Sequence, residues 1–394
     1  MFITISNRNN IIIWASSFFP VIGGLQSATF EIGRYLIRKN WNVHIITNRY
    51  PRALKSYETI SELKVFRYIF LSNPIQYFLS GRIDMFFAWF FLKPINLMRL
   101  IVHFIRFKPK VVNIHFPDHQ LLECYLLMLL FRFKIIISVH GNEVERIHTL
   151  SKKSIRYFLY NKLFISANKI TGCSQYLLNK LHELFPHLDH NDFVPQHNGV
   201  NEKYFEQPLF ASKNENIFSA ARFIPKKGLD LLLKASQKFS QNQLHIAGGD
   251  DSDFLTLGLK KREGLFLLGP LSQDDLANNL AQAKLTIIPS KEEPYGIIVA
   301  EALCCGSPVV ATNVGGIPEV IALATEKLSP NEKEIFDSWV KLVKPNIDSI
   351  KKGIDALLNN NGAIEDYINL VPKFRNNFIW EKRLENYLKL INTY

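Results

Sequence analysis

The chain alternates short apolar runs, rich in β-branched residues, with amphipathic stretches, and this alternation constrains its fold more than any other feature. In the first half the strand-like runs lie at residues 11–15, 43–47, 111–115, 135–140 and 169–172. Helical patterns lie between them, as at residues 27–39 and 175–184. Such alternation predicts parallel strands joined by helices that cover both faces of a sheet. We therefore expect an α/β protein with doubly wound, Rossmann-like sheets.

The alternation restarts after a polar, proline-containing segment at residues 206–216, which is typical of an interdomain linker. New strand-like runs follow at residues 217–220, 243–247, 265–268, 285–289 and 309–312. A length of 394 residues also suits two domains. We predict a first Rossmann-like domain over residues 1–205 and a second over 206–372. Such domains bind ligands beyond the carboxyl ends of their strands, so we expect the binding site in a cleft between the two.

The excess of positive charge lies in the first half of the chain. Residues 1–205 hold 25 Lys and Arg against 12 Asp and Glu, whereas residues 206–394 hold 22 against 23. This asymmetry indicates an anionic partner for the first half, unless the surface is merely basic and soluble. A membrane surface and a phosphorylated acceptor are candidates. Nucleic acid is not expected, because the aromatic residues lie in apolar runs and no nucleic-acid-binding motif is present.

A very apolar run, MFFAWFFL at residues 85–92, is stopped by Lys93 and Pro94. A run of eight residues is too short to cross a bilayer. The longer stretch 85–108 mixes Phe, Leu, Ile and Trp with Lys and Arg, as a cationic interfacial helix does, or two such helices around the proline. We expect this stretch to contact an anionic membrane surface. The alternative is an ordinary buried helix of the first domain.

The cysteines and the N-terminus bear on the compartment. The four cysteines show no paired spacing, and no Cys/His cluster has the spacing of zinc ligands. No charged region followed by a small-residue cleavage site marks a signal peptide. These features predict a cytoplasmic protein, which membrane contact would place peripherally on the inner face of the cell membrane.

The stretch that carries most of the chemistry is PSKEEPYGIIVAEALCCGSPVVATNVGGIPEV at residues 289–320. Seven residues separate Glu293 from Glu301. Because Pro294 disfavours helix before it, Glu293 is expected on a loop ahead of a helix that begins near Gly296. Glu301 then lies inside that helix. The two carboxylates can accept hydrogen bonds from the hydroxyls of a sugar or a ribose.

The start of this helix and two basic residues predict a diphosphate site. The backbone amides around Tyr295, Gly296 and Ile297 would face an incoming anion at the positive end of the helix. Arg222 follows a strand-like run and Lys227 opens a helix, so both are expected at strand ends. Their guanidinium and ammonium groups suit a departing diphosphate. Surface ion pairing is the alternative for these two cations.

The first half offers weaker signals of the same kind. Gly23 and Gly24 lie between a strand-like run and a helix, where a backbone without Cβ atoms can approach a phosphate, although a plain glycine turn would look the same. No G-x-G-x-x-G follows the strand, which argues against a nicotinamide or flavin enzyme. His140 ends a strand-like run and could contact a sugar, whereas His115 is interpreted as structural.

The cluster DDSD at residues 250–253 resembles a metal-binding D-x-D motif. It follows Gly248 and Gly249 in an expected strand-to-helix turn, where carboxylates commonly cap the helix. We therefore predict a helix cap and no catalytic metal.

Together these motifs resemble those of the retaining GT-B glycosyltransferases of the family-4 type. The matching segments are FFPVIGG at 18–24, HG at 140–141, HNGV at 197–200, ARFIPKKGLDLLLKA at 221–235, EEPYGIIVAEALCCGSPVVAT at 292–312 and VGGIPEV at 314–320. FIWEK at 378–382 resembles the family's final helix, which implies that residues 373–394 cross back onto the first domain.

The resemblance implies roles for the residues named above. Arg222 and Lys227 would hold the diphosphate of the donor, and Glu301 would bind the ribose hydroxyls. Glu293 would contact the transferred sugar together with the amides at the helix start. From the first domain, Gly24 would approach the diphosphate and His140 would contact the sugar near the reacting carbon.

The implied reaction moves a hexose-type sugar from a nucleotide diphosphate sugar to a glycan or lipid-linked acceptor, with retained configuration and no cofactor. Cell-surface polysaccharide or glycolipid synthesis is the implied setting. A sugar-nucleotide epimerase on the same architecture and a non-catalytic binder of anionic surfaces remain alternatives. The chain departs from the family pattern at Asn201, where an acidic residue is usual, at Gly248–Asp250, and in the glycine-free segment 321–339, which looks like an insertion.

Overall fold

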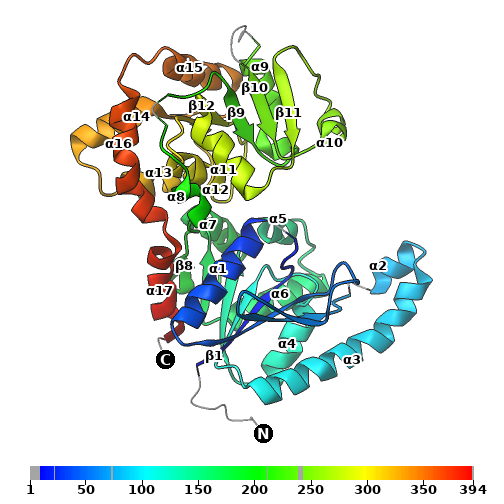
Figure 1. Ribbon diagram of the computed structural model, residues 1–394. Helices are drawn as coiled ribbons and strands as arrows, with labels where there is room; N and C mark the ends of the chain where they lie inside the picture. The colour runs from blue at the N-terminus through cyan, green and yellow to red at the C-terminus, as the bar shows by residue number, and fades with distance from the viewer. Residues whose placement is uncertain (1–8, 22, 72–73, 211, 238–242, 393–394) are drawn as a thin grey trace. The chain divides into compact units, whose positions relative to one another are not determined.

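The computed structural model describes residues 9–21, 23–71, 74–210, 212–237 and 243–392, which fall in two compact units (Figure 1). The first unit contains Met1–Gln196 and Leu384–Tyr394, and the second contains His197–Arg383. The division lies at 196/197 and not at the predicted 205/206, because Tyr204 is buried in the second unit and Val200 pairs with Ile379 there. The segment that returns to the first unit begins at Leu384 rather than at 373.

The sheet of the first unit has the order β3-β4-β2-β1-β5-β6-β7-β8, and all neighbouring strands are parallel except β3 and β4. Its strands are β1 (Asn10–Ala15), β2 (Asn42–Asn48), β3 (Tyr57–Ile60), β4 (Leu63–Tyr68), β5 (Val111–His115), β6 (Lys134–Val139), β7 (Lys169–Gly172) and β8 (Phe193–Pro195). Its helices are α1 (Gly24–Arg38), α2 (Pro74–Leu79), α3 (Ile83–Phe107), α4 (Leu121–Leu130), α5 (Asn142–His148), α6 (Ile155–Ile165), α7 (Gln175–Leu184) and the end of α17 (Trp380–Asn392). Every residue of β1 is buried, as expected for a central strand covered on both faces.

The sheet of the second unit is wholly parallel, with the order β11-β10-β9-β12-β13-β14. Its strands are β9 (Ile217–Ala220), β10 (Leu244–Ala247), β11 (Leu265–Gly269), β12 (Leu285–Ile288), β13 (Val309–Thr312) and β14 (Val340–Val343). Its α-helices are α8 (Glu202–Glu206), α9 (Leu229–Ala235), α10 (Asp251–Thr256), α11 (Gln273–Gln282), α12 (Ile297–Cys304), α13 (Ile317–Thr325), α14 (Pro330–Trp339), α15 (Ile347–Leu358), α16 (Ile364–Arg375) and the start of α17. Buried Ile, Leu, Val and Phe side chains from the strands and from α9 and α15 form its core.

Both sheets are doubly wound, which confirms the expected fold class. In each sheet the chain builds outward in one direction from a central strand and then in the other, so the order reverses between β1 and β5 and between β9 and β12. Loops that leave the carboxyl ends of strands on either side of such a reversal diverge, and ligands of doubly wound folds bind there. Four loops therefore become candidates for the functional site, those that follow β1, β5, β9 and β12.

The glycine-free segment 321–339 forms the end of α13 and the whole of α14. Ser329 and Glu332 make a reciprocal capping box at the start of α14. The segment is therefore the helical crossover between the parallel strands β13 and β14, and it needs no glycine because Ser329 and Pro330 start its second helix.

Candidate active site

A partly buried ion pair joins the loops that follow β9 and β12. The short 3₁₀ helix at Pro225–Lys227 carries Lys227, whose Nζ lies 2.5 Å from Oε2 of Glu293. The Glu293 carboxylate is 8% exposed and also accepts a hydrogen bond from Ser290 Oγ at 3.3 Å. Two residues that the sequence predicted for one site are thus in direct contact.

Glycines hold the Glu293 loop at fixed distances from its neighbours. Gly228 has a φ of +69°, and a Cβ there would lie 1.9 Å from the carbonyl oxygen of Pro289. Gly315 has a φ of +59°, and a Cβ there would lie 1.8 Å from the carbonyl oxygen of Glu293. The amide of Gly316 donates to that same oxygen at 3.0 Å. Neither close approach tolerates a side chain, so these glycines set the position of the Glu293 backbone.

The predicted helix start is confirmed at α12. Gly296 is its N-cap in the left-handed region with a φ of +97°, and Ile297 is its first residue. The amides of a first helical turn have no preceding carbonyl within the helix, so they can bind an anion. The Tyr295 side chain is buried, and its hydroxyl donates to the carbonyl oxygen of Asn198 at 3.0 Å. Tyr295 therefore anchors this turn through its side chain.

Arg222 lies two residues beyond the end of β9 and is exposed. Glu293 pairs with Lys227 and not with Arg222. The predicted pair of cations therefore consists of one paired ammonium group and one solvent-facing guanidinium group. The guanidinium group is available to an anion that arrives at this edge of the sheet.

Glu301 lies one turn inside α12, where burial raises the pKa of its carboxyl group to about 8. A hydrogen bond with the side chain of Tyr204 opposes this shift of the Glu301 pKa. The carboxyl group is therefore largely protonated at neutral pH. Sequence reasoning missed Tyr204, because 97 positions separate it from Glu301 and neither lies in a common motif.

In the first unit His140 follows β6 and is half-buried. Its Nε2 lies 3.0 Å from Nδ1 of His115, and the two rings stack with centroids 5.3 Å apart. The backbone amide of His140 donates to the buried carboxylate of Glu143 in α5. Burial lowers the pKa of His140 to about 4, and it lowers the pKa of His115 well below its usual range. Both imidazoles are therefore neutral near pH 7.

A chain of buried hydrogen bonds fixes which nitrogen of His140 carries its proton. Ser138 donates to Oδ1 of Asn113 at 2.9 Å, so the amide nitrogen of Asn113 faces Nε2 of His115 at 2.8 Å and donates to it. That nitrogen also donates to the Tyr387 hydroxyl of α17 at 2.7 Å. Nδ1 of His115 then holds a proton and donates to Nε2 of His140, which leaves the proton of His140 on Nδ1. His115 is structural, as predicted, and it orients the candidate residue.

Gly23 and Gly24 lie between β1 and α1, where Gly24 is the first helical residue. A Cβ at Gly24 would meet no atom within 4 Å, whereas one at Gly23 would lie 2.8 Å from the flexible side chain of Gln26. The backbone at the start of α1 is therefore open to a ligand. As predicted, this pair of glycines lies between a strand and a helix, at the start of α1.

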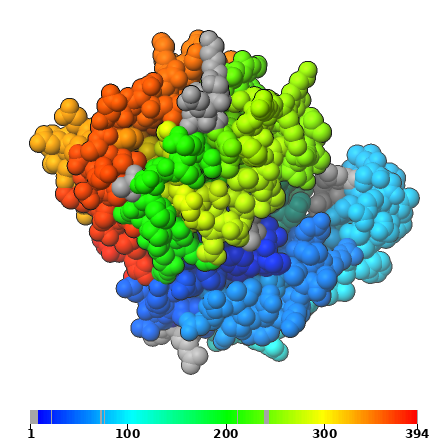
Figure 2. All heavy atoms as spheres, turned by 45° about the horizontal axis from the view of Figure 1, so that its top comes forward, coloured from blue at the N-terminus to red at the C-terminus, as the bar shows by residue number. Residues whose placement is uncertain are grey.

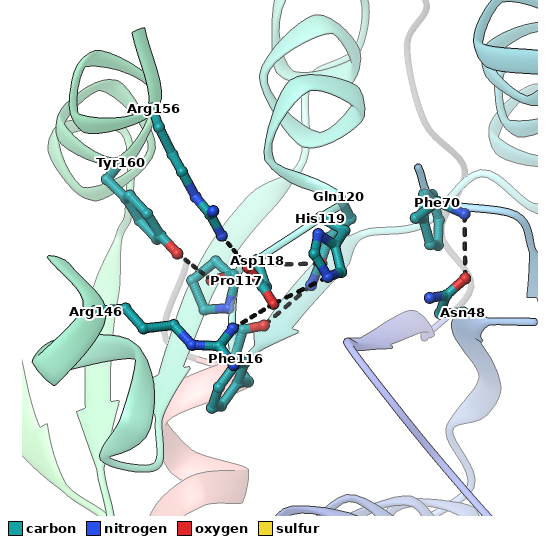
Figure 3. A network of polar contacts seen from close by, with 10 residues as sticks. All are labelled: Asn48, Phe70, Phe116, Pro117, Asp118, His119, Gln120, Arg146, Arg156 and Tyr160. Carbon is teal, nitrogen blue, oxygen red and sulfur yellow. Dashed lines mark hydrogen bonds and ion pairs between the residues drawn. The ribbon is translucent and has the colours of Figure 1, made fainter. Parts of the chain in front are cut away.

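A charged cluster that the sequence did not predict follows β5 (Figure 3). Asp118 accepts hydrogen bonds from Arg156 and from Arg146, the latter at 2.7 Å. His119 Nε2 lies 3.5 Å from the same carboxylate. The preceding carbonyl of Pro117 accepts from the Tyr160 hydroxyl at 2.7 Å. The residues come from three separate parts of the chain, so no local motif indicates them.

Asp250 caps α10 in a capping box with Asp253, which confirms the cap predicted for the DDSD cluster. Across the described residues, no group of three or more His, Cys, Asp or Glu side chains is placed to hold a metal ion. Arg222, Lys227 and the amides at the start of α12 supply positive charge at the candidate site.

Comparison with known proteins agrees with this geometry. The profile of the family described as Glycosyltransferase Family 4 matches residues 22–204, and that of Glycosyl transferases group 1 matches residues 200–378. An uncharacterized glycosyltransferase of Methanocaldococcus jannaschii is 27% identical over 376 residues, which cover 90% of each chain. The N-acetyl-α-D-glucosaminyl L-malate synthase of Bacillus anthracis is 25% identical over 325 residues, which cover 77% of this chain and 79% of the synthase.

Among solved structures, sucrose-phosphate synthase of Thermosynechococcus elongatus has a TM-score of 0.72 at 18% identity, with 97% of this chain and 98% of that chain covered. The likeness in structure shows a shared fold, and the two sequence profiles together span both units. The chain therefore belongs to the group 1 glycosyltransferases of the family-4 type, with the GT-B fold.

Proposed function

We propose that this glycosyltransferase moves a hexose-type sugar, with retention of configuration, from a nucleotide diphosphate sugar to a glycan or lipid-linked acceptor. The observation that carries the proposal is the Lys227–Glu293 pair in loops at the reversal of the second sheet. A carboxylate that is held beside a cation can accept hydrogen bonds from a sugar, while the cation stays within reach of its phosphate. The Bacillus anthracis relative is named for an N-acetylglucosaminyl product, which fits a hexose-type donor.

The donor would be bound mainly by the second unit. Arg222, Lys227 and the amides of Gly296 and Ile297 supply positive charge for the diphosphate, and they would stabilise the charge that develops as it departs. Glu301 would bind the ribose hydroxyls. Because protein groups supply this charge, we propose that turnover requires no metal ion and no cofactor.

In the first unit, Gly24 would allow the backbone to approach the diphosphate, and His140 would donate its Nδ1 proton to a hydroxyl of the sugar. With a pKa near 4, a neutral His140 suits hydrogen-bond donation better than proton transfer at neutral pH. This favours a reaction in which the departing diphosphate takes the acceptor's proton. The epimerase alternative is not retained, because the chain belongs to a glycosyltransferase family.

We further propose that α3 holds the protein on an anionic membrane from the cytoplasmic side. The structure corrects one expectation, since Pro94 lies inside one continuous helix and does not separate two. In the described part of the chain, α3 is the one helix long and apolar enough to cross a membrane by length and composition. One face of α3 is committed to the first unit, where Leu100 and Phe104 are buried, and this favours a position on the membrane surface.

The outer face of α3 is apolar along its length. Its exposed large side chains recur every three or four residues at Ile83, Phe87, Phe90, Phe91, Ile95, Met98, Val102 and Ile105. The buried face, by contrast, contains Lys93, paired with Glu123 at 2.6 Å, and Asn96, which donates to a backbone carbonyl. A surface helix of a soluble protein shows the opposite arrangement. We call this exposed row of α3 side chains the apolar stripe.

Basic residues accompany the stripe. Arg82 precedes α3, and Arg106, Lys108 and Lys110 lie exposed at its other end. With α2, the first part of α3 forms a hairpin that extends from the sheet of the first unit, and Figure 2 shows it in light blue at the right. Apolar burial and attraction between cations and anionic lipids act together on such a surface.

A donor panel tests the central proposal. Thermal unfolding of the full chain would be measured with uridine, guanosine and adenosine diphosphate sugars, since a ligand that binds only the folded state raises the unfolding temperature. We expect one of them to stabilise the wild type, and Lys227→Ala to reduce that shift. No shift with any member would contradict the proposed donor site.

A further inference from the structure

The first unit contains a cavity of about 340 Å³ beside the charged cluster that follows β5. Its walls come from α2, α3, α4 and α6, and they include the apolar side chains of Trp89, Leu122, Ile155 and Leu159. Pockets for small ligands range from about 300 to 1,000 Å³, so this cavity is large enough for part of a ligand. We call it the chain pocket. None of the residues assigned above to the donor lines it.

One edge of the chain pocket is cationic. Arg156 and Asp118 both line it, and Asp118 also binds Arg146 (Figure 3). The carboxylate of Asp118 is 7% exposed, whereas the side chains of Arg146 and Arg156 are 53% and 39% exposed. Two guanidinium groups facing one carboxylate leave one positive charge in excess. Each guanidinium group carries five N–H groups, so both can donate hydrogen bonds to a phosphate while they keep their hydrogen bonds to Asp118.

The chain pocket adjoins both the sheet reversal and the surface proposed to face the membrane. Asp118 and His119 belong to the loop at the carboxyl end of β5, one of the two strands at the reversal. Ile75 of α2 lines the pocket and is 61% exposed, and Trp89 brings α3 into its wall. A hydrocarbon chain can therefore enter from the apolar hairpin of α2 and α3 and lie mainly against apolar side chains, away from the charged edge.

We propose that the chain pocket binds the hydrocarbon chain of a phosphate-bearing lipid, that Arg146 and Arg156 bind its phosphate, and that this lipid is the sugar acceptor. Apolar walls recognise the chain and the two guanidinium groups recognise the phosphate, so neither inorganic phosphate nor an uncharged alkyl chain satisfies the whole site. The acceptor role rests on the proposed function, whereas lipid binding does not.

Binding is measured by titrating the full-length protein with alkyl phosphates from butyl to octyl, with inorganic phosphate and octanol for comparison. The affinity should rise about threefold to fourfold with each methylene that enters an apolar site. Inorganic phosphate and octanol should each bind much more weakly than octyl phosphate. The proposed lipid site would be contradicted by an affinity that does not change with the length of the alkyl chain, or by an octyl phosphate affinity equal to that of inorganic phosphate.

Two matched pairs of variants locate the site. Leu122→Trp fills the pocket and should remove the dependence on chain length, whereas Leu130→Trp on the exposed part of the same helix should not. Arg156→Gln should weaken the binding of octyl phosphate at least tenfold. Lys152→Gln should not, because Lys152 lies exposed ahead of α6. Equal effects within either pair would assign the binding elsewhere and overturn the proposal. The wild-type series remains decisive if a variant does not fold.

The acceptor role has a separate readout. With a radiolabelled donor and a long-chain lipid phosphate, label should enter the lipid, and Leu122→Trp should reduce this transfer whereas Leu130→Trp should not. If the donor is consumed but no label enters the lipid, the acceptor role fails while the proposed function stands. If the lipid binds but no donor is ever consumed, the proposed function fails and the lipid site stands.

Discussion

At the scale of single residues, the candidate site is built from side chains whose charges are already set before any ligand arrives. Lys227 pairs with Glu293 at hydrogen-bonding distance, and Asn113 and His115 hold His140 as one neutral tautomer. Such preorganisation means that charge developing in the reaction meets groups that need not reorient. The predictions at this scale each remove one of these groups.

The two cations proposed to bind the diphosphate, Arg222 and Lys227, should matter separately. Arg222→Ala and Lys227→Ala should each lower kcat/KM by about tenfold to a thousandfold, as the loss of a charge-assisted contact does. Steady-state kinetics measure this, with unfolding curves to show that each variant is folded. Lys234→Ala, an exposed lysine on the neighbouring α9, is the control. Unchanged kinetics in a folded Lys227→Ala variant would remove Lys227 from the site.

Glu301 should make stability depend on pH. Its pKa is raised to about 8 in the folded protein from its usual value of 4.5, so the folded state holds a proton that the unfolded state releases. The contribution of this carboxyl group to the free energy of unfolding is fully present below pH 4.5 and is lost as the pH rises through 8. The unfolding free energy of the wild type should therefore fall relative to Glu301→Gln between about pH 5 and pH 9. Urea unfolding at several pH values measures this, and parallel curves for the two proteins would show that the carboxyl group is not buried.

Asn113 should affect turnover through His140 without contacting the nucleotide sugar. Asn113→Ala removes the side-chain amide whose hydrogen bond fixes the tautomer of His115. A buried hydrogen-bonding group left without its partner costs about 1–3 kcal/mol of stability. Turnover should fall about tenfold if one such bond to His140 is misplaced, while donor affinity changes little. Kinetics and donor titration separate the two effects, and Thr171→Val, farther along the same polar chain, serves as the comparison. A loss of donor affinity equal to the loss of turnover would argue against a positioning role.

At the scale of elements, the apolar periodicity predicted most of the central strands to within a residue or two. The run 11–15 became Asn10–Ala15, and 309–312 became Val309–Thr312 without change. The edge strands β3, β8 and β14 were missed, and so was β4, which lies next to β3. β3 alternates exposed and half-buried residues, and Ser61 and Glu62 turn it into β4 with positive φ values where glycine or asparagine is usual. Short, polar edge strands carry too few apolar residues to show a period.

The site was predicted in part for a related reason. Residues within one motif, such as Glu293, Gly296 and Glu301, lie where their spacing indicated. Contacts between loops depend on strand order, which local patterns do not contain. The Asp118 cluster and the Tyr204–Glu301 hydrogen bond both join residues that are distant in the sequence, and only the fold brings them together.

The apolar stripe of α3 yields the prediction at this scale. Phe87, Phe90 and Phe91 lie exposed, whereas Phe86 is half-buried and Trp89 lines the chain pocket, so the triple serine variant of the three exposed positions is the appropriate test. Burying a large apolar side chain is worth about 1.5–3 kcal/mol, so binding to anionic vesicles should fall at least tenfold. Co-sedimentation with phosphatidylglycerol vesicles measures it.

The control for this test replaces the exposed Leu129 and Leu130 of α4 with serine, which should leave binding unchanged. Wild-type binding should also weaken as salt rises, because ions screen the attraction between surface charges. If neither salt nor the triple variant changes the bound fraction, α3 does not face a membrane.

At the scale of the whole molecule, the two doubly wound units divide the chemistry. The second, with nearly balanced charge, carries the cations and carboxylates proposed for the donor. The first, with most of the excess positive charge, carries His140, the apolar stripe and the chain pocket. Under these proposals, donor specificity and acceptor specificity can change independently.

The most direct test of the account follows radiolabelled sugar from donor to product. The full-length protein would be incubated, in buffer with EDTA, with the stabilising donor from the panel and vesicles that contain a lipid phosphate. We expect labelled product with the wild type and a loss of about a hundredfold or more with Glu293→Gln, in the range found when one stabilising group is removed. Equal rates for the two proteins, or product only after Mg²⁺ or Mn²⁺ is added, would contradict it.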